Sequence, residues 1–515
     1  MYRWWLRSCC LCIALCGRVL CAPAQYWVEV PVDPPADMPS GARFGAALAL
    51  ADDMLLVGAP EADAGEASSG LAVLYGRYHG GVNGWGELAR FAPLTPVPQG
   101  GFGTSVHLSG DLALIGAPGE VNVSETTGGI HVYQRHLGGN ENWGLLQRIT
   151  IDSLFPGMRF GEHFLLAGDV LLVDCPGYDE NRQDLNSGNG ALVVFERDAS
   201  GLFRHRRFIK GGSLVPTTTN RPALSGWFAV HDQRLVYTSN AYKAYSVPLQ
   251  AVLTEAFFEP EPLVLTDTYG YQPTALEYKG VVSSDDHLIV DVQVSPPSSP
   301  PQLVAFVNNE EGALVQAGRM RPDTLAQGIE WWGWGQALHI AHDRVVVGAF
   351  GHEFFTPLGH AEVFTRDNTA QNGWRRIGYL VASDPSYGDQ FGKAARSDDE
   401  IVVIGAPGYG DADRGRVYVY LDPNVGSLET LAREATAFCW PVPVLRTSGI
   451  LHLSPAAAAW AGEYTIHDMQ GRLLRAVRSR GSELDVSGLE VGAYTLVWRP
   501  VDRPGPMSTR FIIAP

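Results

Sequence analysis

Short runs of alternating apolar and polar residues recur along most of the chain, separated by turns rich in Gly, Asp and Asn. A period of two is typical of half-buried β-strands rather than helices. Residues 102–149 illustrate the pattern with four predicted strands: FGTSVHLSG, LALIGAP, GGIHVYQR and NWGLLQRI. Asp suits tight hairpins because its side chain bonds its own backbone. We therefore interpret as turn formers the aspartates between the first two strands of each unit: Asp53, Asp111, Asp169, Asp232, Asp286, Asp343 and Asp399.

The four-strand unit recurs with fixed landmarks. A Phe-Gly pair precedes a Gly-Ala-Pro triplet by fourteen residues in three units, which begin at Phe44, Phe102 and Phe391. Two further units, beginning at Phe160 and Trp334, keep this spacing with substitutions, and residues 223–240 and 277–292 are candidates for two eroded copies. Repetition about every 58 residues with strand-like content predicts a propeller. The chain is therefore expected to be all-β, with a seven-bladed β-propeller in which each four-stranded sheet is one blade.

A tryptophan marks the predicted fourth strand of a unit, seventeen residues before the next Phe, at Trp85, Trp143 and Trp374. Trp27 has the same offset from Phe44, so residues 26–32 are predicted to be a fourth strand without a unit of their own. The last unit supplies only three strands. We expect the N-terminal strand to complete the last blade and close a ring over residues 25–421, because closure leaves no unpaired edge.

The Phe-Gly to Gly-Ala-Pro unit resembles the FG-GAP repeat of integrin α-subunit propellers and of many bacterial surface proteins, over about 400 residues of chain. Many such repeats resemble calcium sites, with an Asp-rich loop between their first two strands. The corresponding turns here are too short for that loop. Acidic loops between the second and third strands offer two other cation candidates, although acidic loop residues are more often simply solvated. The candidate pairs are Asp184 with Asn186 and Asp411 with Asp413, and calcium is the one cofactor that they suggest.

The N-terminus has the features of a secretory signal. Two arginines precede an apolar run, and the segment CAPAQ offers an Ala-x-Ala cleavage site ending at Ala24. Residues 1–24 are therefore predicted to be a signal peptide. Five of the seven cysteines lie within it, and the remaining Cys175 and Cys439 fall in different predicted domains, so no disulfide framework is expected. No later segment has the ~20 apolar residues that a membrane span needs.

The C-terminal part has a different pattern. Residues 422–438 are predicted to be a linker, and a small all-β module follows at 439–515. Three of its segments resemble, in order, the elements of the type IX secretion C-terminal sorting domain: 440–454, 464–477 and 484–498. Trp440 and Val442 depart from the usual first element. The resemblance implies a small β-sandwich that the type IX secretion machinery recognises, and export through the periplasm to the cell surface or the medium.

Charge and motifs narrow the function classes. Thirty-eight basic and fifty-five acidic residues give a net charge of -17, which argues against nucleic acid and anionic membranes as partners. After the predicted signal peptide, the sequence has no nucleophile elbow, zinc-protease helix, phosphate-binding loop or Cys-x-x-Cys motif. Carboxylate pairs of glycosidases come from distant strands and leave no local motif. Two functions therefore remain: an adhesin-like or scaffold binding protein for protein or glycan, and a secreted hydrolase or lyase acting on polysaccharide or peptide at the propeller centre.

Binding is expected on one face of the propeller. Strands within a blade alternate in direction, so the connections between strands two and three and those leading to the next blade emerge together. They are the longer and more varied connections, where propellers are expected to carry recognition. Trp331 and Trp332 belong to this face. They are expected either to form an exposed aromatic platform for a sugar ring or a protein, or to pack locally within the loop. Four of these connections are acidic: 61–70, 119–129, 177–190 and 408–415.

Overall fold

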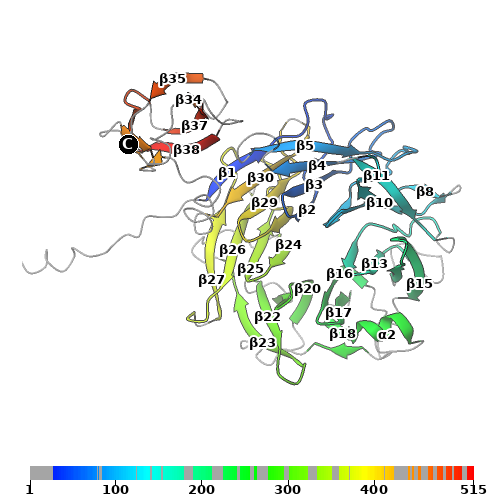
Figure 1. Ribbon diagram of the computed structural model, residues 1–515. Coiled ribbons are helices and arrows are strands. Elements are labelled where there is room, and N and C mark those ends of the chain that lie inside the picture. The colour runs from blue at the N-terminus through cyan, green and yellow to red at the C-terminus, as the bar shows by residue number, and fades with distance from the viewer. Residues whose placement is uncertain are drawn as a thin grey trace, which may run out of the picture.

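The computed structural model shows a ring of seven four-stranded antiparallel sheets, which confirms the predicted seven-bladed β-propeller (Figure 1). One short helix, α2 (Leu249–Thr254), is the helical element within the described part of the chain. The structure describes residues 27–514 except 78, 80–83, 123–124, 140–141, 152–154, 179–189, 211–223, 240–243, 256–259, 264–275, 295–300, 323–332, 351–358, 371, 411, 423–438, 441–443, 446–449, 454–461, 468–472, 480–482, 490–491 and 501–506.

Blades 1 to 6 each run from an inner strand to an outer strand in chain order. Blade 1 comprises β2 (Ala47–Ala51), β3 (Met54–Ala59), β4 (Leu71–Arg77) and β5 (Trp85–Phe91). Blade 2 comprises β6 (Ser105–Ser109), β7 (Leu112–Ala117), β10 (Gly129–Arg135) and β11 (Trp143–Ile149), with a small ribbon of β8 (Val121–Asn122) and β9 (Glu125–Thr126). Blade 3 comprises β12 (Phe164–Ala167), β13 (Val170–Cys175), β14 (Ala191–Arg197) and β15 (Phe203–Lys210).

The later blades repeat this order. Blade 4 comprises β16 (Leu224–His231), β17 (Arg234–Ser239), β18 (Ala244–Pro248) and β19 (Glu261–Pro262), with α2 between the last two. Blade 5 comprises β20 (Leu276–Ser283), β21 (Leu288–Val294), β22 (Gln302–Asn308) and β23 (Leu314–Met320). Blade 6 comprises β24 (Trp334–Ala341), β25 (Arg344–Ala349), β26 (His360–Arg366) and β27 (Trp374–Leu380). Blade 7 comprises β28 (Ala394–Ser397), β29 (Ile401–Ala406), β30 (Arg416–Leu421) and β1 (Val28–Val32).

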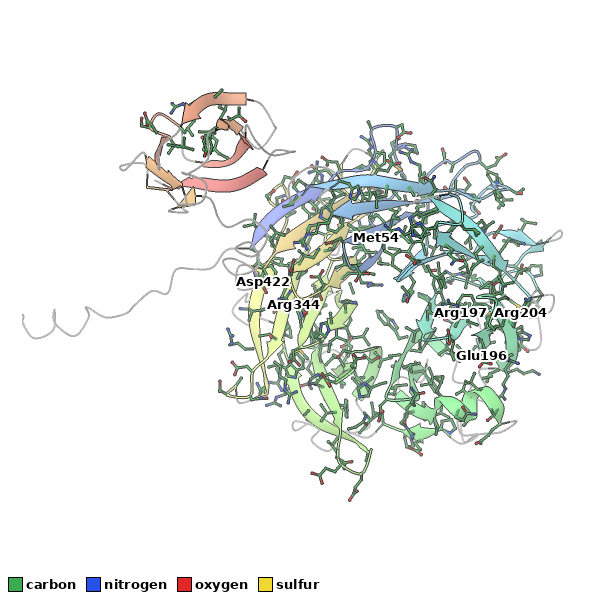
Figure 2. The ribbon with its side chains drawn as sticks, viewed as in Figure 1. Met54, Glu196, Arg197, Arg204, Arg344 and Asp422 are labelled. Atoms are coloured by element: carbon green, nitrogen blue, oxygen red, sulfur yellow. The ribbon has the colours of Figure 1, made fainter. Side chains whose placement is uncertain are left out.

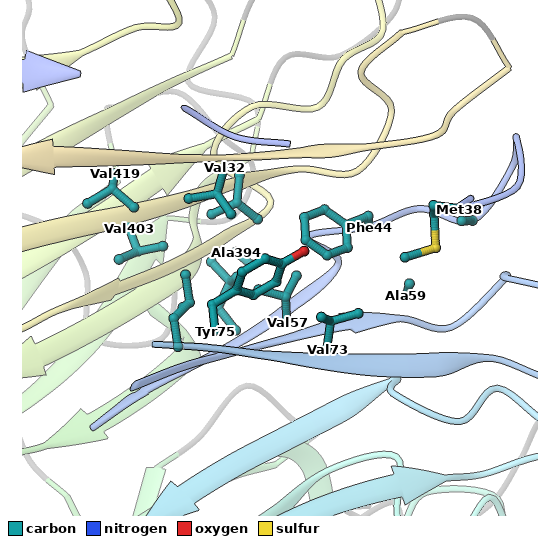
Figure 3. Packing of buried hydrophobic residues seen from close by; sticks show 14 of the residues in the cluster. Val32, Met38, Phe44, Val57, Ala59, Val73, Tyr75, Ala394, Val403 and Val419 are labelled. Carbon is teal, nitrogen blue, oxygen red and sulfur yellow. The ribbon is translucent and has the colours of Figure 1, made fainter. Parts of the chain in front are cut away.

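The outer strand of blade 7 thus comes from the N-terminal end of the described chain. Strand β1 pairs antiparallel with β30, from Val28 opposite Leu421 to Val32 opposite Val417. Val32 is buried in a hydrophobic cluster that blades 7 and 1 share, together with Phe44 and Val57 of the neighbouring blade (Figure 3). The two ends of the ring are therefore joined both by backbone pairing and by a common core.

A Phe-Gly pair joins each of blades 1, 2 and 3 to the blade before it. The side chains of Phe44, Phe102 and Phe160 are completely buried. Each forms a parallel β-bridge with a glycine that ends the preceding blade's connection, and these bridges pair Phe44 with Gly415, Phe102 with Gly70 and Phe160 with Gly128. The motif therefore supplies both an apolar anchor and a main-chain contact between blades.

The glycine of the Gly-Ala-Pro triplet allows the next blade to approach. A Cβ at Gly116 would lie 2.0 Å from the carbonyl oxygen of Gly161, and one at Gly405 would lie 2.0 Å from that of Gly45. Carbon and oxygen atoms cannot come so close, so only glycine fits while the neighbouring Phe-Gly backbone keeps its place. In blade 3 the same position is occupied by Asp174, and the sequence of the next unit lacks a Phe-Gly pair.

We expect Gly116→Ala to lower the free energy of unfolding by about 2 kcal/mol, because blade 3 must move away from the added methyl group. Urea denaturation of the purified protein measures this loss. Gly110→Asn is the matched control, since Gly110 lies in a turn with φ +54 and, apart from its chain neighbours, no residue has an atom within 4 Å of its Cβ position. Asn tolerates that backbone conformation. An unchanged urea midpoint for Gly116→Ala would contradict the close contact between the blades.

The C-terminal residues form two further small sheets. One contains β31 (Cys439–Trp440), β33 (Ile450–Leu453) and β36 (Glu483–Asp485), and the other contains β32 (Val444–Leu445), β38 (Met507–Ala514), β37 (Gly492–Pro500), β34 (Gly462–His467) and β35 (Leu473–Ser479). Tyr464 and Leu484, one from each sheet, are buried. Arg475 of β35 donates hydrogen bonds to the carbonyl oxygens of Asp485 (2.6 Å) and Ser487 (3.0 Å). Among the described strands, none of these pairs with a propeller strand.

Candidate functional site

Antiparallel pairing throughout the blades gives the ring two different faces. The connections between second and third strands and those between blades lie on one side, which we call the loop face. The connections between first and second and between third and fourth strands lie on the other side, which we call the turn face. The described connections of the loop face include 33–46, 60–70, 92–104, 381–393 and 407–415 without residue 411.

Five of the six candidate binding and metal residues lie outside the described residues, and the predictions about their roles remain predictions. Asp413 is described: its side chain is exposed, and its carbonyl oxygen accepts the amide hydrogen of Arg43 at 3.0 Å. This bond ties connection 407–415 to connection 33–46. In the described ranges, no group of three or more His, Cys, Asp or Glu side chains is arranged to hold a metal ion. The residues outside are Trp331, Trp332, Asp184, Asn186 and Asp411.

A polar network fixes part of the loop face around Arg416. The Arg416 guanidinium lies 2.5 Å from the carboxylate of Asp33 and 2.7 Å from that of Asp384, and 4.1 Å above the ring centroid of Tyr409. Asp384 accepts further hydrogen bonds from the hydroxyls of Tyr409 (2.6 Å) and Tyr418 (2.9 Å). Three connections that are far apart in sequence are therefore joined at one arginine, which makes this part of the face rigid.

The network also determines the ionisation of Asp384. Burial alone would raise the pKa of this carboxyl, but the hydrogen bonds from Tyr409 and Tyr418 and the charge of Arg416 outweigh burial and lower it. Burial and the carboxylate of Asp384 raise the pKa of the Tyr418 hydroxyl. Asp384 is consequently ionised and both tyrosines are neutral donors near pH 7, so the network keeps one charge state under ordinary conditions.

Several large apolar side chains project from the loop face into solvent. Leu94 is 76% exposed and Tyr387 is 64% exposed, and Val121 and Val381 are also exposed. Single exposed apolar residues are common, but an exposed tyrosine or leucine on a rigid frame is suited to contact a partner. Sequence reasoning missed these residues. The available signal was an apolar residue within each of two turn-rich connections, FAPLTPVPQG and SDPSYGDQ.

A basic cluster lies on the inner strands of the ring. Arg396 belongs to β28, His339 to β24 and His107 to β6, and each side chain is half-buried. Burial and the charge of Arg396 lower the pKa of His107 to about 4 and that of His339 to about 3. Burial lowers the pKa of Arg396 to about 10. At neutral pH the cluster therefore carries one positive charge, on Arg396, beside two neutral imidazoles.

The lowered pKa values of His107 and His339 predict that the protein loses stability in acid. Their pKa values are lower in the folded protein than in the unfolded chain, so the unfolded chain binds more protons between pH 6.5 and 4, and stability falls as the pH falls through that range. We expect His107→Gln with His339→Gln to reduce this loss by on the order of 2 kcal/mol, allowing for partial exposure. Unfolding in urea at several pH values measures the effect. The exposed His136→Gln is the control, and equal pH slopes in both variants would contradict the assignment.

A second group of ionisable residues lies in blade 3. Asp174 is completely buried, and its carboxylate oxygen lies 3.7 Å from Nδ1 of His163. Burial raises the pKa of Asp174 and that of the neighbouring Glu162, which also pairs with Arg159. Raised carboxyl pKa values suit proton donors in catalysis, although structural ion pairs also perturb them. The His163 side chain is 51% exposed, so the group reaches solvent through this imidazole.

A family model of the FG-GAP repeat matches residues 374–420, which extend from the outer strand of blade 6 through β30 of blade 7. The protein is thus an all-β protein with a seven-bladed β-propeller that carries an FG-GAP repeat. No curated protein matches the sequence. In the described residues, no helix combines the length and the apolar character needed to cross a membrane.

Among the similar solved structures, two have 10% sequence identity to this chain. One is PorZ, an essential bacterial surface component of the type IX secretion system of Porphyromonas gingivalis, with a TM-score of 0.25, covering 91% of this chain and 70% of PorZ. The other is a chain of a mitotic checkpoint complex, with a TM-score of 0.42, covering 79% of this chain and 98% of the other.

Proposed function

We propose that the protein is an exported binding protein, either on the cell surface or secreted, whose loop face recognises a protein or a glycan as an adhesin or scaffold does. The observation that carries the proposal is the combination of a rigid frame and exposed contact residues on one face. Strand β1 and the Arg416 network tie the connections together, while Leu94 and Tyr387 remain open to solvent. Preorganised surfaces of this kind lose little entropy on binding.

The proposed route of export involves both ends of the chain. Residues 1–24 would act as a signal peptide, and residues 439–515 would be the type IX sorting domain that the secretion machinery recognises. The support is the sequence of the three C-terminal elements, together with the finding that the described strands of this region form sheets of their own. Deletion of residues 439–515 should then leave the protein in the periplasm, in a protease-resistant form. Normal surface display of the truncated protein would contradict this route.

The binding proposal is tested by applying the purified mature protein to an array of immobilised glycans and matrix proteins. We expect saturable binding to a restricted set of them, without chemical change. Each array component that binds is then incubated with the protein in solution, and products are sought by mass spectrometry. Failure to bind any component, or turnover of the components that bind, would contradict a purely binding role.

The alternative function is a secreted hydrolase or lyase, and the Glu162, His163 and Asp174 group is the observation that favours it. If turnover is found, Asp174→Asn should abolish it while leaving binding intact, because the amide cannot donate or accept the reacting proton as the carboxyl does. Glu196→Gln, at an exposed carboxylate of the same blade, is the control. Unchanged turnover in Asp174→Asn would exclude this group as the catalytic one.

A further inference from the structure

We propose that the inner strands of the ring bind a small oxyanion, with Arg396 as the charged group and His339 and His107 as its neighbours. The proposal does not rest on the loop face or on any partner there. It starts from an imbalance of charge: the chain is strongly acidic overall, with a net charge of -17, yet the cluster at these three inner strands is basic.

Arg396 has no carboxylate partner among the described residues. Its one hydrogen bond there runs from Nη1 to the carbonyl oxygen of Ala395, at 2.7 Å. A half-buried guanidinium that lacks a counter-charge is unfavourable, because burial removes water from the charge and nothing replaces it. Other arginines of the propeller meet this need, as Arg344 does by pairing with Asp422 and Arg416 does by pairing with Asp384. Arg396 is therefore positioned to accept an anion from solution.

The histidine next to Arg396 presents a donor. The backbone amide of Ser397 donates to Nδ1 of His339, at 3.2 Å. Nδ1 consequently has no proton, and in the neutral ring the proton resides on Nε2. No described residue accepts a hydrogen bond from that Nε2 atom. His339 thus provides a neutral N–H donor in addition to the charged guanidinium of Arg396.

These donors fit an oxyanion better than a halide. A guanidinium presents paired N–H groups that match two oxygens of a phosphate, sulfate or carboxylate group. An imidazole N–H binds a third oxygen or the remaining edge of the same anion. His107 lies on the inner strand of blade 2, and burial and the charge of Arg396 lower the pKa of its ring. The ligand class is therefore a small phosphate, sulfate or carboxylate, either free or at the end of a larger molecule.

The test is calorimetric titration of the mature protein, at pH 7 and constant ionic strength, with inorganic phosphate, sulfate and acetate in turn and chloride as the reference salt. We expect saturable binding of at least one oxyanion and at least tenfold weaker binding in Arg396→Gln. Arg204→Gln, at an exposed arginine of blade 3 paired with Asp198, should bind like the wild-type protein. Equal affinity in Arg396→Gln, or no saturable binding of any oxyanion, would overturn the proposal.

A second measurement does not depend on the stability of Arg396→Gln. Imidazole resonances of the wild-type protein are assigned by His107→Gln and His339→Gln and followed during the same titrations. The resonances of these two rings should shift with the saturation curve while those of the exposed His136 stay in place. Binding that leaves both rings unshifted would place the anion elsewhere and would equally overturn the proposal. Binding of phosphate or sulfate without binding of acetate would identify the ligand as a phosphate or sulfate group, and the reverse result would identify it as a carboxylate.

Discussion

Deletion of residues 25–33 should lower the free energy of unfolding by at least about 5 kcal/mol, the largest effect expected for any small change in the chain. The deletion removes β1, whose Val30 and Val32 are buried between blades 7 and 1. Each fully buried valine contributes about 1.5–3 kcal/mol. The deletion also leaves β30 as an exposed edge strand, which favours aggregation.

Contacts beyond the strand pairing increase the effect. The indole of Trp27 packs against Gly378 of blade 6, and its Nε1 lies 3.4 Å from the carbonyl oxygen of Ile377. The carboxylate of Glu29 accepts hydrogen bonds from the hydroxyl (2.6 Å) and the amide (2.9 Å) of Ser383. The N-terminal segment therefore holds blades 6 and 7 together as well as closing the ring.

Single substitutions within β1 provide a graded version of this experiment. Val32, 4% exposed, should cost about 1–2 kcal/mol when changed to Ala, whereas Val28, 42% exposed, should cost little. Urea denaturation and calorimetric melting measure all three proteins. A deletion variant that melts like the full-length protein would contradict closure of the ring by β1.

Asp422→Ala should lower the free energy of unfolding by about 3–5 kcal/mol, because it leaves the guanidinium of Arg344 buried without its partner. The side chains of Asp422 and Arg344 are 1% and 8% exposed and form an ion pair (Figure 2). Arg344 also donates to the carbonyl oxygen of Asp398 at 2.7 Å, and the amide of Asp422 donates to that of Glu400 at 2.9 Å. The pair thus connects blade 6 to the end of blade 7.

The double variant Arg344→Met with Asp422→Leu distinguishes an unpaired charge from lost packing. It removes both charges and should be clearly more stable than Asp422→Ala alone. Glu196→Ala breaks the exposed pair of Glu196 with Arg206 and should cost less than about 1 kcal/mol. If Asp422→Ala proved no more harmful than Glu196→Ala in the same denaturation assay, the buried pair would not have the role described here.

Much of the fold was predictable because each intact repeat makes the same contacts. The Phe of each Phe-Gly pair needs a buried site, and the glycine fourteen residues later needs the close approach of the next blade, so both leave a mark in the sequence. The fourth blade lacks these marks. Its pattern gave no indication that α2 precedes the two-residue outer strand β19, since local propensity there is overridden by packing against the ring.

For the candidate site, the sequence could predict which face of the propeller carries it but not which residues form it. Alternation of strand direction places the longer connections on one side, whatever their residues are. The Arg416 network could not be predicted, because Asp33 and Asp384 are distant in sequence and meet only when the ring is closed. The cluster of Arg396, His339 and His107 was missed for a similar reason. Each of these residues lies on a different blade, and no spacing within a single repeat relates them.

The central claim is that the loop face of this propeller binds a partner, and the most direct test compares one exposed residue on each face. Tyr387→Ala changes the loop face, and Leu137→Ala changes an exposed residue in a turn-face connection. On the glycan or matrix protein that the wild-type protein binds most strongly, we expect Tyr387→Ala to weaken binding at least tenfold and Leu137→Ala to leave it unchanged, with equal melting temperatures. Unchanged binding in Tyr387→Ala together with weakened binding in Leu137→Ala would contradict the account.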